Sequence, residues 1–121
     1  MVETNPSDKQ AIFNLGIAYR NDKKYDQAIE SFSRVISLEP NFPNAYYERG
    51  YCYSKMGLFP QARLDMGASI MNQPDYGPSY MLRGRCFEAL GNLKSACKDW
   101  QKAYELGVKE ADEFIFEKCK E

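Results

Sequence analysis

The sequence predicts an all-α fold made of three helix-turn-helix repeats and a seventh, capping helix. Small, aromatic and proline residues recur every 34 residues along the chain. The apolar residues between them have helical rather than alternating spacing. The recurring positions are Gly16, Gly50 and Gly84; Tyr19, Tyr53 and Phe87; Ala28, Ala62 and Ala96; Phe32, Met66 and Trp100; Pro40 and Pro74. A period of this length is typical of a solenoid, in which each repeat buries its apolar face against a neighbour.

The first repeat is expected at residues 9–42, after an N-terminal extension at residues 1–8. Its first helix carries apolar residues at helical spacing and ends at a turn over residues 21–24. The second helix stops before Pro40, because proline cannot continue a helix.

The second repeat is expected at residues 43–76, with Pro43 in the first turn of a helix, where proline is well tolerated. Its turn is predicted at residues 56–58, and its second helix at residues 59–71.

The third repeat is expected at residues 77–108, with a turn at Gly91-Asn92. Residues 109–121 then form a C-terminal capping helix, which a solenoid needs because its last repeat would otherwise expose an apolar face. Phe116 falls outside the apolar stripe of this helix and is expected to be partly exposed. The stripe consists of Ala111, Phe114, Ile115 and Cys119.

These residues resemble the tetratricopeptide repeat family, whose pattern has a large residue, Leu, Gly and Tyr on the first helix. Ala, an aromatic residue, another Ala and Pro follow on the second helix. The resemblance covers residues 9 to about 108 in three consecutive matches and departs from the pattern at Val108, where proline is usual. It implies a right-handed α-solenoid whose first helices line a concave face that binds a protein or peptide.

The resemblance also selects the side chains that would face a bound peptide. Most of them form two ladders of apolar and aromatic residues, with a few charged residues beside them. The candidates are Phe13, Ile17, Arg20, Tyr47, Glu48, Tyr51, Met81 and Arg85. The alternative is that these ladders pack against neighbouring helices or are covered by the terminal helix.

Some family members bind the acidic C-terminal tails of heat-shock chaperones through a two-carboxylate clamp of Lys, Asn and Arg side chains. The matching positions here are Phe13, Ile17, Glu48, Pro78 and Leu82, and none of them matches the clamp. Glu48 would repel an acidic tail. The sequence therefore predicts that this chain does not bind such tails.

Two of the repeats share an arginine and an aspartate that the first repeat lacks. The arginine and the aspartate occur together, and Leu15 and Ser31 replace both in the first repeat, which suggests an ion pair between the two helices of a hairpin. The alternative is that the arginines clamp a ligand carboxylate. The predicted pairs are Arg49 with Asp65 and Arg83 with Asp99.

Composition argues against several classes of protein. A net charge of −1 does not suggest nucleic-acid binding, and no apolar stretch reaches the roughly 20 residues that cross a bilayer. Histidine is absent, which removes the commonest general base and the commonest nitrogen ligand of zinc. We therefore expect no enzyme activity, no cofactor and no metal.

The first ten residues lack a basic and then apolar signal segment. The sequence as it stands therefore predicts a cytoplasmic protein, or an exported one if a leader has been cleaved.

The cysteines fall into two groups. Cys52 and Cys86 occupy the same position in successive repeats, so both are predicted to be buried. Cys97 and Cys119 would approach each other if the last helix folds back, but spacing alone does not establish a disulfide. The redox compartment therefore stays open.

Together these observations predict a non-catalytic module that holds a peptide or protein segment in a concave groove. The alternative is a structural spacer or oligomerisation unit within a larger bacterial assembly, with weak self-association through the N-terminal end.

Overall fold

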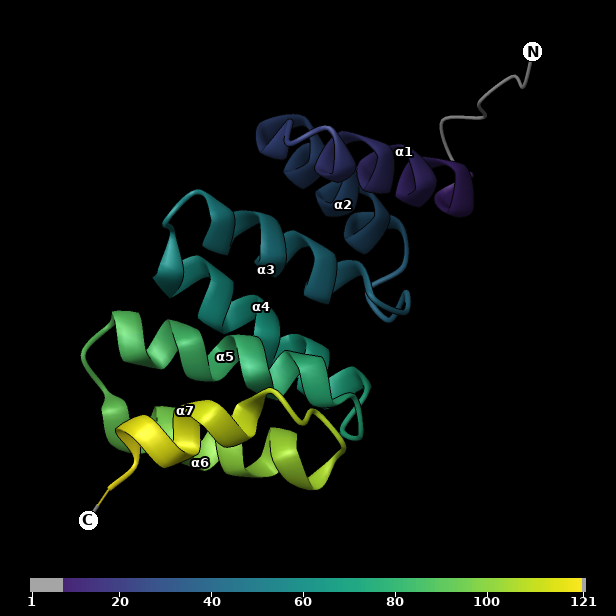
Figure 1. Ribbon diagram of the computed structural model, residues 1–121. Helices are drawn as coiled ribbons and strands as arrows, with labels where there is room; N and C mark the ends of the chain where they lie inside the picture. Colours follow the sequence, from purple (N-terminus) through teal and green to yellow (C-terminus); the bar gives the residue numbers. More distant parts are fainter. Residues whose placement is uncertain (1–7, 121) are drawn as a thin grey trace.

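The computed structural model describes residues 8–120, which form seven α-helices and no strand (Figure 1). The all-α prediction is confirmed. Apart from residue 8, the predicted N-terminal extension lies outside the described residues. No helix of the described part combines the length and the apolar character that a membrane span requires. The helices are α1 (Lys9–Asn21), α2 (Tyr25–Leu38), α3 (Ala45–Lys55), α4 (Phe59–Asn72), α5 (Gly77–Ala89), α6 (Leu93–Glu105) and α7 (Ala111–Lys118).

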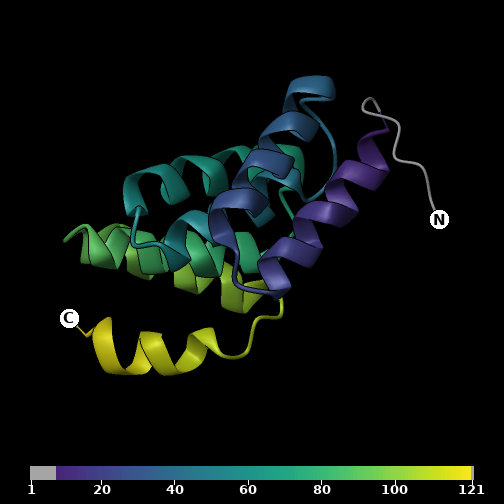
Figure 2. The same cartoon turned by 90° about the horizontal axis from the view of Figure 1, so that it is seen from above.

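The helices are arranged as an α-solenoid. In Figure 1 the pairs α1–α2, α3–α4 and α5–α6 follow one another down the molecule, and the described chain ends at the side opposite to its start. Each helix packs against the next one in sequence, and the first helices also contact each other, α1 with α3 and α3 with α5. Seen from above, α7 lies at the outer edge of the molecule (Figure 2).

One predicted helix start is wrong. Pro43 does not open a helix, because α3 begins only at Ala45 and Asn44 before it has a left-handed backbone with φ 70°. The segment before α3 is instead a tight turn, in which the Phe42 N–H donates to the Glu39 carbonyl at 3.0 Å. Phe42 packs against the buried cluster of Ile12, Val35 and Ala45, so tertiary packing draws the turn inward and delays the helix.

Glycines allow the paired helices to approach closely. A Cβ placed on Gly84 would lie 2.5 Å from Nε1 of Trp100 and 3.1 Å from the Ala96 carbonyl oxygen. A Cβ on Gly16 would lie 2.6 Å from the ring of Phe32. The repeated glycine therefore makes room for the large residue that the same repeat places on its second helix.

The buried core follows the same repeat positions. Phe32, Met66 and Trp100 are fully buried, as are the alanines at 28, 62 and 96. Cys52 and Cys86 are buried free thiols, as predicted. Burial raises the pKa of Cys52 to about 12 and that of Cys86 to about 11, so both stay protonated at neutral pH.

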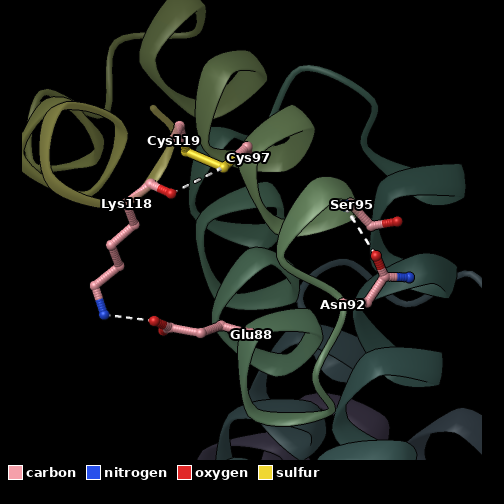
Figure 3. Close-up of a disulfide and its surroundings, with 6 residues drawn as sticks. All are labelled: Glu88, Asn92, Ser95, Cys97, Lys118 and Cys119. Carbon is pink, nitrogen blue, oxygen red and sulfur yellow. Dashed lines mark hydrogen bonds and ion pairs between the residues drawn. A yellow bond between two sulfur atoms is a disulfide. The ribbon is translucent and has the colours of Figure 1, made fainter. Parts of the chain in front are cut away.

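The last helix folds back onto α6 and is held there by a disulfide. Cys97 and Cys119 are joined, with their Cα atoms 5.7 Å apart (Figure 3). The Phe114 ring stacks on Trp100 with centroids 5.0 Å apart, and Lys118 forms an ion pair with Glu88 of α5. Ala111 is buried, whereas Phe116 is 76% exposed. α7 therefore covers Trp100 and closes this end of the core.

The cysteine pairing predicts a specific thiol count. Protein purified without reductant is expected to show two titratable thiols after denaturation and four after reduction. In the native state, Cys52 and Cys86 are expected to react slowly with a thiolate-specific reagent, because burial keeps them protonated. Titration with a chromogenic disulfide reagent measures all three states. Four thiols in denatured, unreduced protein would contradict the Cys97–Cys119 disulfide.

Candidate functional site

A groove of about 400 Å³ lies between α3, α5 and the segment that leads into α7. Its lining is mostly apolar and aromatic, with one arginine and one glutamate. The lining residues are Tyr47, Tyr51, Pro78, Met81, Leu82, Arg85, Val108 and Glu110. The structure thus brings together Tyr47, Tyr51, Met81 and Arg85, which the sequence predicts on the concave face.

Two of the three predicted residues of the first repeat, Phe13 and Ile17, have a different environment. The Phe13 ring lies 5.4 Å from Phe32 and 5.2 Å from Phe42, measured between ring centroids. Ile17 packs against the buried cluster that contains Phe32 and Cys52. Both side chains are partly buried and neither lines the groove. Their contacts favour the alternative that these two residues pack against neighbouring helices.

Arg20 and Glu48 pair with each other. Arg20 Nε lies 2.9 Å from Glu48 Oε1, which joins α1 to α3 beside the groove. The Arg20 guanidinium also lies over the Tyr51 ring, 5.3 Å from its centroid. Burial raises the pKa of Glu48, and the nearby Arg20 opposes this shift. The pair therefore supports the Tyr51 ring through Arg20 and places the carboxyl group of Glu48 next to the groove.

Tyr47 is the most strongly perturbed titratable group of the groove lining. Its ring meets the Tyr76 ring edge-on, with centroids 5.3 Å apart. Burial is the main reason that its pKa rises to about 12, with smaller contributions from Tyr76 and Glu48. The phenol stays neutral over the physiological range, so Tyr47 offers an apolar ring with one hydrogen-bonding hydroxyl.

The charged residues of the groove lie at its α7 side. Arg85 is exposed, and its guanidinium lies 6.0 Å from the Phe114 ring centroid. Glu110, immediately before α7, is also exposed. The groove therefore combines an apolar floor with one positive and one negative group, which is the mixture that peptide-binding surfaces use.

Both predicted Arg–Asp pairs are present, and they lie away from the groove. Each arginine donates two hydrogen bonds to its aspartate, at 2.8 Å for both Arg49–Asp65 bonds and at 2.7 and 2.8 Å for Arg83–Asp99. Arg49 also donates to Ser33 Oγ on α2 at 3.1 Å, a contact between repeats. Because each guanidinium already holds a carboxylate in two bonds, the geometry favours scaffold pairs over a ligand clamp.

Sequence comparison of the repeats misses several groove residues. Val108 and Glu110 reach the groove only because the chain turns back into α7, which no repeat position indicates. Val108 carries a weak signal, since it stands where the pattern has proline. Pro78 and Leu82 flank Met81 on α5 within one helical turn. Within residues 8–120, no cluster of three or more acidic, Cys or His side chains is arranged to hold a metal ion.

Comparison with known proteins agrees with the fold. A family model described as TPR repeat matches residues 16–57. The first TPR of Spaghetti (RPAP3), solved bound to the HSP90 peptide SRMEEVD, superposes with a TM-score of 0.88. The match covers 98% of this chain and 96% of that chain at 23% sequence identity. Residues 16–57 therefore match a TPR repeat, and the described chain has the fold of a TPR domain.

Other solved structures are also similar to this chain. A crystal structure of MamA matches with a TM-score of 0.81 and 28% identity, over 89% of this chain and 63% of that chain. The TPR2B domain of yeast Sti1, solved in complex with pHsp70, matches with a TM-score of 0.84 and 18% identity. This match covers 89% of this chain and 93% of that chain. A search of curated proteins by sequence gave no significant match.

Proposed function

We propose that this chain is a TPR domain and acts as a non-catalytic protein-interaction module, which holds a peptide or protein segment in the groove between α3, α5 and the start of α7. One observation carries the proposal: the predicted concave-face residues Tyr47, Tyr51, Met81 and Arg85 line one apolar groove. The similar TPR domains of Spaghetti, bound to an HSP90 peptide, and of Sti1, in complex with pHsp70, support a binding role.

The groove favours a segment with an apolar or aromatic anchor. Tyr47, Tyr51 and Met81 offer large, partly buried side chains, and such residues dominate binding energy at protein interfaces. Arg85 and Glu110 at the rim would set the orientation of the segment through its own charges or its backbone carbonyls. These rim charges contribute more to specificity than to affinity.

An acidic heat-shock tail is a poor ligand for this groove. Pro78 and Leu82 line it where the resemblance expects clamp side chains, so no cation stands at either place. The carboxylate of Glu48 lies beside the groove and already has Arg20 as its partner. A second carboxylate brought to this position would be repelled, which supports the prediction that SRMEEVD-type peptides do not bind.

The absence of catalysis is part of the same proposal. The sequence has no histidine to act as a general base. Asp65 and Asp99, the buried carboxylates, are each held by an arginine, and the thiols of Cys52 and Cys86 are kept protonated by burial. None of these groups has the exposed, activated state of a catalytic residue.

Replacing Tyr47 and Tyr51 together with alanine is expected to weaken peptide binding at least about tenfold, because hot-spot residues of this type contribute more than about 1.4 kcal/mol. Ligands would be selected from a random phage-displayed peptide library on the wild-type domain and then measured by fluorescence polarisation on both proteins.

The synthetic peptide SRMEEVD is the negative control and is expected not to bind. A Leu64→Ala variant is the matched control for loss of apolar surface, because Leu64 is 63% exposed on α4 and does not line the groove. Equal affinities for wild type and a folded Tyr47→Ala, Tyr51→Ala variant would refute the groove assignment.

A further inference from the structure

The hollow beside the Cys97–Cys119 disulfide lies apart from the peptide groove and has a distinct chemistry. It measures about 540 Å³, and both cysteines of the disulfide line it. Both cysteines are only partly buried, so a small molecule that enters the hollow comes into contact with the residues of the disulfide. None of the peptide-groove residues belongs to this lining.

Lysine side chains surround the disulfide, and none of the described residues of the lining is acidic. Lys94 and Lys98 are exposed, lie one turn apart on α6 and have no acidic partner within residues 8–120. Lys118 forms an ion pair with Glu88 (Figure 3). Lys120 lies over the Phe116 ring. The hollow is therefore positive at the point where the disulfide is accessible.

We propose that this hollow is a thiol-exchange site, at which a small anionic thiol opens the Cys97–Cys119 disulfide and releases the covalent tether of α7. Exchange depends on access to the sulfur and on the stability of the thiolate that leaves. The hollow supplies the access, and the lysines attract an anionic thiol and stabilise the thiolate that forms. This site is independent of the proposed peptide binding.

The exchange needs two molecules of the small thiol and neither a metal nor a protein cofactor. The thiolate of the small thiol attacks Cys119 Sγ and forms a mixed disulfide, while the bond to Cys97 breaks and its electron pair leaves on Cys97 Sγ. A second thiolate then attacks the sulfur of the small thiol in the mixed disulfide and frees Cys119. The net result is one reduced protein disulfide and one oxidised pair of small thiols.

The structure favours Cys97 as the leaving thiolate. Cys97 lies in the second turn of α6, between Lys94 and Lys98 in the sequence, and the positive charges of these lysines stabilise a thiolate there. Cys119 instead caps the C-terminal end of α7, where the helix dipole disfavours a thiolate.

Opening the disulfide leaves α7 with its non-covalent contacts. These include the stacking of Phe114 on Trp100, the Lys118–Glu88 ion pair and the burial of Ala111. α7 has eight residues, which is too short for a helix that is stable by itself. The exchange therefore weakens the cap that covers the last repeat.

The test measures how fast the disulfide of the full chain opens with glutathione, which is negatively charged, and with 2-mercaptoethanol, which is neutral. Alkylation of the released thiols followed by mass spectrometry gives both rates. The Lys94→Gln, Lys98→Gln variant is expected to slow glutathione about threefold at low salt and to change 2-mercaptoethanol much less. Added salt is expected to remove the difference for glutathione.

A Lys102→Gln, Lys109→Gln variant is the matched control, because these lysines are exposed but do not line the hollow. It is expected to react with both thiols at the wild-type rates, and the mixed disulfide is expected on Cys119. The proposal is overturned if glutathione does not open the disulfide, if the Lys94, Lys98 variant reacts with it at the wild-type rate, or if that variant slows both thiols equally.

Discussion

Replacing Arg49 with leucine is expected to lower the free energy of unfolding by about 3–5 kcal/mol, because it leaves a buried carboxylate without its cation. Asp65 is only 5% exposed and receives two hydrogen bonds from Arg49 at 2.8 Å. The same substitution removes the bond from Arg49 to Ser33, which connects the first repeat to the second. Urea denaturation followed by circular dichroism measures the loss.

The first repeat supplies a matched control for this prediction. It has Leu15 and Ser31 where the second repeat has Arg49 and Asp65, and it packs without this ion pair. The double variant Arg49→Leu, Asp65→Ser is therefore expected to lose clearly less stability than Arg49→Leu alone. Equal losses in the single and double variants would contradict the explanation by an unpaired buried charge.

The loss in Arg49→Leu is also expected to depend on pH. Burial raises the pKa of Asp65, and removal of Arg49 takes away the interactions that oppose this shift. A carboxyl group with a raised pKa in the folded state destabilises the protein above that pKa, and the penalty disappears below the pKa of the unfolded chain. The deficit of the single variant is therefore expected to shrink as the pH falls.

Replacing Trp100 with alanine is expected to cost about 3–5 kcal/mol, since it removes the largest side chain of the core. Trp100 is fully buried, contacts Gly84 of α5 and stacks on Phe114 of α7. Its loss leaves a cavity between α5 and α6 and takes away the surface on which α7 rests. Because the chain has one tryptophan, circular dichroism rather than tryptophan fluorescence must follow the unfolding of this variant.

Phe116→Ala is the control for the loss of an aromatic ring from the same region. Phe116 belongs to α7 but is 76% exposed, so its replacement is expected to change stability by less than about 0.5 kcal/mol. Similar losses for Phe116→Ala and Trp100→Ala would mean that burial against α7 does not explain the contribution of Trp100.

Most of the helices are predictable from the sequence because their signals are local. The repeated glycine, alanine and aromatic positions mark the contact face of each helix, and Pro40 and Pro74 mark the ends of second helices. The start of α3 is not predictable in this way. Pro43 favours a helix start, but the packing of Phe42 and the left-handed Asn44 place the start at Ala45.

The repeat period was sufficient to predict the α-solenoid, because it records which face each helix presents to its neighbours. The resemblance to tetratricopeptide repeats then selected the residues that α3 and α5 bring to the groove. The tertiary structure decided the rest. Phe13 and Ile17 share the register of the groove residues yet pack inward, since their surroundings differ at the first repeat. Val108 reaches the groove, and Cys97 and Cys119 join, because α7 folds back onto α6. The sequence predicts the capping helix from its apolar stripe, but only the tertiary structure brings its C-terminal cysteine to Cys97.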